Sequence, residues 1–167
     1  ESYSVVYTPL NGTGIECVTR ILKEIGVEKV FVVPEQAKPD GNFPTCTYPN
    51  PEFREALELA LKLADEKKPK LVVATDADRM GTAIPHDGEY KLLSGNEMGV
   101  LLMDWLSNMA AANGEDVRRK VAVTTIVSSA MPDVLAEDKG FELRRVLTGF
   151  KYIGDQIDHL KDEGEED

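Results

Sequence analysis

Two aspartates and an arginine stand close together in one short loop, as Asp76, Asp78 and Arg79. They follow residues 71–74 (Leu-Val-Val-Ala), an apolar run that predicts a buried strand of a parallel sheet. Open α/β sheets place their ligands beyond the carboxyl ends of such strands. Carboxylate oxygens suit Mg²⁺, and a planar guanidinium suits phosphate oxygens. The loop therefore indicates a site for a metal ion and a phosphate, with a solvated turn as the alternative.

A second candidate loop lies at another junction between a strand and a helix, where Thr148, Gly149 and Lys151 flank a phenylalanine. The backbone N–H groups at the start of a helix attract anions, and Lys151 adds a positive charge. The loop is therefore a candidate phosphate site. The alternative is a threonine that caps the helix beside a solvated lysine.

A glycine-rich turn, with Gly12 and Gly14, follows the first expected strand and opens a helix. A dinucleotide-binding fingerprint needs a third glycine three residues after the second. That position holds Cys17, so the fingerprint is broken. The residues favour a tight strand-to-helix turn over nucleotide binding.

The remaining reactive side chains do not form a recognisable site. Cys17 and Cys46 lack the spacing of metal ligands, and His86 and His159 stand far apart in the chain. The sequence has no Gly-x-Ser-x-Gly nucleophile motif and no P-loop. The two strand-end loops therefore remain the candidate sites.

Strands and helices alternate along the chain in the order that parallel sheets require. We expect strands at residues 4–8, 30–33, 71–74, 121–127 and 142–147, and a return strand at residues 90–93. We expect helices at residues 15–25, from Asn50 onward, around residues 101–109, and at residues 131–138 and 150–160. The pattern predicts an α/β fold of two α/β/α layered units with mixed, mostly parallel sheets. Residues 1–92 and 93–167 are the expected domains.

A long polar loop separates the second expected strand from the helix after it. The loop contains Pro39, Gly41, Pro44 and Pro49, and it exceeds the usual length of a connection inside a domain. Structureless connections of this size are often functional.

Composition places the chain among globular proteins. Its 167 residues are 42% hydrophobic and 29% charged, which suits one domain or two small ones. The net charge of −11 argues against nucleic acid as a partner, because phosphate neutralisation needs a basic face.

No apolar run in the sequence approaches the roughly 20 residues that a membrane-spanning helix needs. Two cysteines make no disulfide framework, so a reducing cytoplasm is the expected location.

Several segments, taken in order, resemble the α-D-phosphohexomutases, the family of phosphoglucomutase and phosphomannomutase. The resemblance rests on residues 6–14 (Val-Tyr-Thr-Pro-Leu-Asn-Gly-Thr-Gly), 34–36 (Pro-Glu-Gln), 39–45 (Pro-Asp-Gly-Asn-Phe-Pro-Thr), 49–52 (Pro-Asn-Pro-Glu), 74–81 (Ala-Thr-Asp-Ala-Asp-Arg-Met-Gly), 93–97 (Leu-Ser-Gly-Asn-Glu) and 148–151 (Thr-Gly-Phe-Lys). The family commonly has histidine in place of Asn11. So many ordered matches, through most of the chain, are more specific than any one motif.

The resemblance implies a part of a four-domain enzyme, namely its second domain and much of its third. Such enzymes interconvert hexose 1-phosphate and hexose 6-phosphate through a phosphoserine and a hexose bisphosphate intermediate. By this resemblance, Asp76 and Asp78 are ligands of Mg²⁺. Arg79, Thr148, Gly149 and Lys151 are expected to contact the substrate.

The chain also departs from the family's pattern. It contains no Thr-Ala-Ser-His-Asn-Pro phosphoserine loop, and it ends at Gly164–Asp167, before the place of the sugar-reading Gly-Glu-Glu-Ser loop. The family's metal loop usually reads Asp-x-Asp-x-Asp-Arg, whereas Ala74 stands where its first aspartate would fall. We therefore expect no catalytic residue in this chain and no activity from it alone.

Two alternatives to a mutase fragment remain. One is a non-catalytic domain that binds phosphate or a phosphosugar through Arg79 and Lys151. The other is a small phosphotransferase with Asp76 as its nucleophile, which is disfavoured because the sequence offers no assignable lysine and distal acids to support it.

Overall fold

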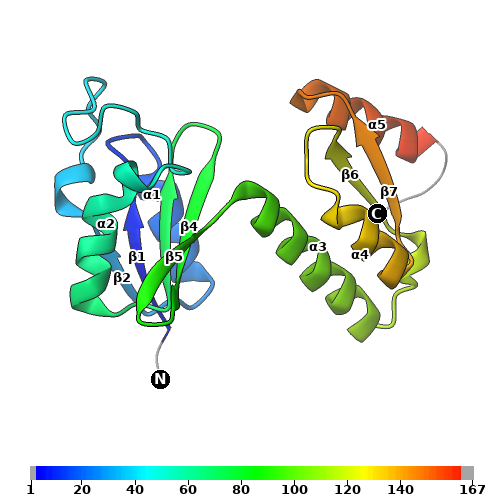
Figure 1. Cartoon of the computed structure of the whole chain (residues 1–167), viewed down its shortest axis with the longest axis horizontal. Helices are drawn as coiled ribbons and strands as arrows, with labels where there is room; N and C mark the ends of the chain where they lie inside the picture. The colour runs from blue at the N-terminus through cyan, green and yellow to red at the C-terminus, as the bar shows by residue number, and fades with distance from the viewer. Residues whose placement is uncertain (1–2, 163–167) are drawn as a thin grey trace. The chain divides into compact units, whose positions relative to one another are not determined.

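The chain forms two compact units, residues 1–95 and residues 96–167 (Figure 1). The computed structural model describes residues 3–162. The end of the chain discussed above, Gly164–Asp167, lies outside the described residues. None of the described helices is long and apolar enough to span a membrane.

The first unit is built on a five-stranded sheet in the order β2-β1-β3-β4-β5. Three strands run parallel: β1 (Ser4–Thr8), β2 (Lys29–Val32) and β3 (Leu71–Thr75). An antiparallel hairpin extends one edge, with β4 (Met80–His86) paired to β3 and β5 (Glu89–Leu93) paired to β4. The sheet is therefore mixed with a parallel core, which confirms the expected fold class.

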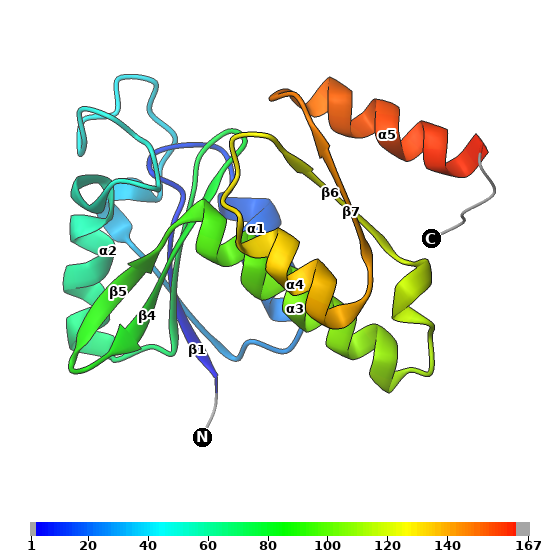
Figure 2. The same cartoon turned by 45° about the vertical axis from the view of Figure 1, so that its right-hand side comes forward.

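Two helices cover opposite faces of this sheet (Figure 2). Helix α2 (Arg54–Lys67) packs with Ala56, Leu57, Ala60, Leu61 and Ala64 against one face of β1 and β3. Helix α1 (Ile15–Glu24) contacts the other face through Val18 and Leu22. Strand β1 is buried on both faces, so its continuous apolar run follows from its place at the centre of the sheet.

The second unit contains α3 (Gly95–Ala112), β6 (Val121–Thr125), α4 (Met131–Lys139), β7 (Glu142–Val146) and α5 (Phe150–Asp162). A short 3₁₀ turn at Val117–Arg119 precedes β6. Strands β6 and β7 pair in parallel as a two-stranded sheet. A sheet this small covers little surface. Within the described part of the unit, only Ser107, Pro132, Ala136 and Phe141 are buried.

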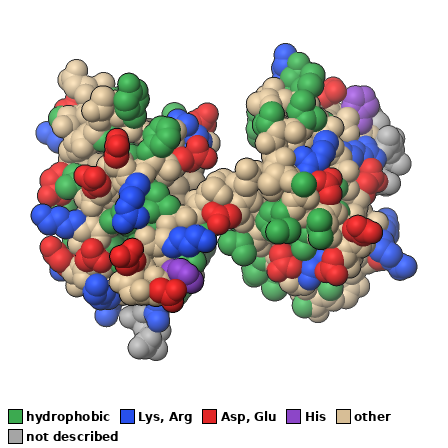
Figure 3. Space-filling view, in the orientation of Figure 1, with side chains coloured by type: hydrophobic (Ala, Val, Ile, Leu, Met, Phe, Trp, Pro, Cys, Tyr) green, Lys and Arg blue, Asp and Glu red, His purple; other side chains and the backbone are tan. Residues whose placement is uncertain are grey.

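Much of the apolar face of α3 is consequently exposed. Trp105 and Leu106 are each 57% exposed, and Leu101, Leu102 and Met109 also face solvent. Figure 3 shows apolar side chains gathered over the second unit, whereas charged side chains dominate the visible face of the first.

One helix begins later than the sequence predicts: α2 starts at Arg54 rather than near Asn50. The Asn50 side chain accepts a hydrogen bond from the backbone N–H of Glu52 at 3.0 Å, but this closes a turn instead of capping the helix. Pro51 is buried in that turn, and its carbonyl group packs directly against Gly81 of β4. Tertiary packing therefore holds residues 50–53 out of the helix.

Buried side-chain hydrogen bonds fasten the long polar loop to the end of β1. The Thr8 hydroxyl donates to Gln36 Oε1 at 2.6 Å, and Gln36 Nε2 donates to Thr45 Oγ1 at 3.1 Å. Thr45 in turn donates to Asn11 Oδ1 at 2.8 Å, and Asn11 Nδ2 donates to the carbonyl of Lys38 at 2.9 Å. We call Thr8, Asn11, Gln36 and Thr45 the polar clamp. Asn11 and Gln36 are almost completely buried, so each needs its partners.

Replacing Thr45 with valine should loosen the polar loop. The substitution keeps the side chain's shape but leaves Asn11 Oδ1 and Gln36 Nε2 short of a partner, which costs roughly 1–3 kcal/mol. The Asp40 amide, which donates to the Asn11 carbonyl at 2.9 Å, should then exchange its hydrogen about ten to a hundred times faster. Thr47→Val, at an exposed position of the same loop, is the matched control. Equal exchange rates in the two variants would contradict the clamp.

Gly81→Ala should destabilise the first unit by roughly 1–3 kcal/mol, because the new methyl group would overlap the Pro51 carbonyl and force the backbone apart. Urea unfolding followed by circular dichroism measures the change. Gly41→Ala is the control, since an added methyl there meets no atom within 4 Å. The packing explanation fails if both variants unfold at the same urea concentration.

Candidate functional site

The Asp76–Arg79 loop connects two paired strands of the first unit. Strand β3 ends at Thr75 and β4 begins at Met80, and these two residues face each other in the antiparallel register. The loop is therefore the turn of a hairpin, at the carboxyl end of a strand whose other neighbour, β1, is parallel to it. This is the sheet edge at which the sequence predicted a site.

Asp76 organises this loop through both of its carboxylate oxygens. Its Oδ1 accepts the backbone N–H of Arg79 at 2.8 Å and that of Asp78 at 3.3 Å. Its Oδ2 accepts Nε of Arg79 at 3.0 Å and forms an ion pair with Nη2 of the same guanidinium at 2.7 Å. The Asp76 side chain is only 14% exposed, whereas that of Asp78 is 83% exposed. The two aspartates therefore have different surroundings, although the sequence predicts the same role for both, as metal ligands.

The strand end before the loop is anchored by a hydrogen bond of 2.8 Å between the hydroxyl groups of Tyr7 and Thr75. Burial raises the pKa of the Tyr7 phenol, and the hydrogen bond to Thr75 opposes that rise. Both hydroxyls approach the backbone of Gly14 so closely that a side chain there would collide with them. The second glycine of the sequence motif thus serves packing between a helix start and two strand ends.

A cavity of about 510 Å³ borders the loop. Residues 76–79 form part of its lining together with Thr13 and Asn50. Three aromatic side chains also belong to the wall: Phe43, Tyr48 and Phe53. The sequence had assigned no site role to these five residues. Two signals pointed toward some of them: the excessive length of the polar loop, which supplies Phe43, Tyr48 and Asn50, and the segments that resemble the family, which include Thr13.

The Mg²⁺ site expected from Asp76 and Asp78 stays a prediction, and the donor set does not fit the ion in this arrangement. Both oxygens of Asp76 already accept hydrogen bonds, and Arg79 places a positive charge against them. Across the described residues, no cluster of three or more histidine, cysteine, aspartate or glutamate side chains could hold a metal ion.

The second predicted site, at Thr148, Gly149 and Lys151, lies in the second unit between β7 and α5. Gly149 has a φ of 136°, a conformation that side chains disfavour. The ammonium of Lys151 lies 4.8 Å from the centroid of the Tyr152 ring, so its charge contacts a neighbour on its own helix. Thr148 is exposed. Their role in substrate binding stays a prediction.

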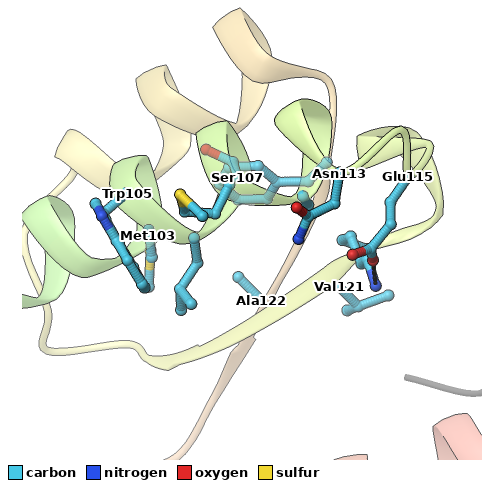
Figure 4. A pocket seen from close by; sticks show the side chains of 12 residues that line it. Met103, Trp105, Ser107, Asn113, Glu115, Val121 and Ala122 are labelled. Atoms are coloured by element: carbon cyan, nitrogen blue, oxygen red, sulfur yellow. Dashed lines mark ion pairs between the residues drawn. The ribbon is translucent and has the colours of Figure 1, made fainter. Parts of the chain in front are cut away.

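The second unit has a cavity of its own, about 560 Å³ in volume, between α3 and β6 (Figure 4). Its lining is mainly apolar and includes Met103, Trp105 and Ala122. Glu115 and Lys120, which form an ion pair at 2.6 Å, also belong to the lining. These two are the only charged side chains among the described residues of the lining, and they are paired with each other.

Two family models match the chain in succession. Residues 1–88 match the phosphoglucomutase/phosphomannomutase alpha/beta/alpha domain II, and residues 94–163 match domain III of the same family.

Curated proteins with similar sequences are also named as phosphomutases. A probable phosphomannomutase of Haemophilus influenzae is 38% identical over 152 residues, and a phosphoglucomutase of Staphylococcus saprophyticus is 37% identical over 158 residues. A phosphopentomutase of Mus musculus is 37% identical over 166 residues. These matches cover 89%, 93% and 95% of this chain but only 30%, 28% and 27% of the relatives. The chain thus spans less than a third of their length.

Solved structures show the same fold. A phosphoglucomutase/phosphomannomutase family protein of Burkholderia thailandensis superposes with a TM-score of 0.72 at 20% identity, covering 97% of this chain and 32% of that one. A putative phosphomannomutase of Thermus thermophilus gives a TM-score of 0.67 at 23% identity, with 93% and 33% covered. With both family models matched in order, this chain belongs to the phosphoglucomutase/phosphomannomutase family.

Proposed function

We propose that this chain is the second domain and part of the third domain of a cytoplasmic phosphohexomutase. The complete enzyme would interconvert hexose 1-phosphate and hexose 6-phosphate through a phosphoserine and a hexose bisphosphate intermediate. Residues 1–92 and 93–167 would be the two domains, and residues 76–79 would correspond to the metal loop. The chain alone would be inactive.

The order of the two family matches carries this proposal. Domain II precedes domain III along the chain, and two relatives that align with 89% and 93% of the chain are named as a probable phosphomannomutase and a phosphoglucomutase. The position of residues 76–79 supports it as well, since they lie at the carboxyl end of a parallel strand and border a cavity.

Phosphoryl transfer depends mainly on holding the donor, the acceptor and the charged groups in line. Such positioning supplies roughly 7–11 kcal/mol of the reduction in barrier. In this chain Thr13, Asn50 and Arg79 line one cavity, but the sequence supplies no phosphoserine motif to donate the phosphate. The chain's residues would therefore orient part of a substrate without completing the transfer.

The non-catalytic alternative, a domain that binds phosphate by itself, has less support. Arg79 already donates Nε–H to Asp76 and forms an ion pair with it through Nη2, and Lys151 lies over Tyr152. Each cation therefore already has a partner within the chain, which an external anion would have to share. A phosphotransferase that uses Asp76 as nucleophile is disfavoured for the same reason, because both carboxylate oxygens are engaged.

The isolated chain should convert no glucose 1-phosphate to glucose 6-phosphate, even with Mg²⁺ and glucose bisphosphate added. The physical reason is the missing phosphate donor. A dehydrogenase that oxidises glucose 6-phosphate reports product formation, and the product of the complete gene that encodes this segment serves as positive control.

Two results would contradict the proposal. One is turnover by the isolated chain that disappears in Asp78→Ala, which would reveal a catalytic group within these residues. The other is a complete gene product that lacks mutase activity on both glucose and mannose phosphates. Saturable binding of glucose 1-phosphate without turnover would favour the non-catalytic alternative.

A further inference from the structure

We propose that the Arg79 guanidinium occupies the cation position at Asp76, so that the loop at residues 76–79 excludes divalent metal ions. The inference rests on the proposed function, in which this loop corresponds to the family's metal loop. It assigns Arg79 the role of an internal counter-ion in place of the metal.

The acceptor capacity of Asp76 is the first argument. An ionised carboxylate has two oxygens with about four lone-pair positions. Two backbone N–H groups, from Asp78 and Arg79, point at Oδ1 at 3.3 and 2.8 Å. Nε and Nη2 of Arg79 lie 3.0 and 2.7 Å from Oδ2. Three hydrogen bonds and one ion-pair contact therefore engage both oxygens, and a metal ion could reach this carboxylate only by displacing some of them.

The second argument is the charge that a metal ion would meet. A divalent cation at Asp76 would lie beside the guanidinium of Arg79, and like charges at such short range repel strongly. Asp78 could still offer an oxygen, but it is 83% exposed and its Oδ1 lies 3.6 Å from Nε of Arg79. One solvated carboxylate is a poor site for Mg²⁺, which gives up its water ligands reluctantly.

The third argument is that the competing cation is tethered. The backbone N–H of Asp76 donates to the carbonyl of Arg79 at 3.2 Å, and the backbone N–H of Arg79 donates back to the Asp76 side chain. The turn therefore keeps the guanidinium within reach of Oδ2. A tethered group acts at a high effective concentration, which a dissolved metal ion must overcome.

Mn²⁺ titration of the whole 167-residue chain tests this inference, because the electron paramagnetic resonance signal of free Mn²⁺ falls as the ion binds. The wild-type chain should show no saturable binding below millimolar Mn²⁺. Arg79→Gln and Arg79→Met, which remove the charge, should bind Mn²⁺ at least about tenfold more tightly. The further change Asp76→Asn should abolish that gain.

Arg20→Gln is the matched control, since Arg20 forms an exposed ion pair with Glu24 at 2.8 Å on α1. It should bind Mn²⁺ as weakly as the wild type. Two outcomes would overturn the inference: wild-type binding at micromolar Mn²⁺ that Asp76→Asn removes, or folded Arg79 variants that gain nothing. If an Arg79 variant fails to fold, the Mn²⁺ titration of the wild-type chain and of Asp76→Asn still tests the inference. The titration reports metal binding, whereas the proposed function is tested by mutase turnover. A failure of this inference is therefore distinguishable from a failure of the proposed function.

Discussion

The need to pair buried polar groups shapes the first unit's candidate site. Thr8, Asn11 and Gln36 are all almost fully buried, yet each carries hydrogen-bonding groups that water cannot reach. Thr45 links two of them, donating to Asn11 and accepting from Gln36. The observed arrangement of the polar loop satisfies these groups, and it brings the loop's aromatic side chains to the cavity beside residues 76–79. An otherwise irregular connection thereby acquires a defined position.

The two units differ in how completely they bury their apolar residues. In the first unit, β1 and β3 lie between two helices, and Val6, Leu57 and Val72 are fully buried. In the second, two strands cannot cover three helices, and Trp105 and Leu106 of α3 remain more than half exposed. Burial of apolar surface is the main stabilising contribution to folding, so the first unit has the stronger basis for a stable structure.

The sequence predicts most of the fold because its signals there are local. Residues 71–74 form an apolar run bounded by polar residues, and they lie in a strand as expected. The spacing of Val18 and Leu22 likewise predicts the face of α1 that contacts the sheet. The start of α2 could not be predicted, since Asn50 has the chemistry of a cap and the contact between Pro51 and Gly81 is a tertiary one. The polar clamp was equally invisible, because its members are up to 37 positions apart in the sequence and share no periodic pattern.

The sequence also predicts the candidate site only in part, even though its residues are neighbours in the chain. Residue types alone indicated that Asp76, Asp78 and Arg79 could bind a metal ion and a phosphate, and they lie together as that pattern requires. Their types could not reveal that the turn directs two backbone N–H groups and one guanidinium at the same carboxylate. A loop with several unpaired acids needs an external cation to offset the repulsion between them. In this loop the guanidinium of Arg79 supplies that positive charge. Because Asp76 also satisfies the backbone of the turn, it would be needed for the shape of the loop even where no metal ion binds.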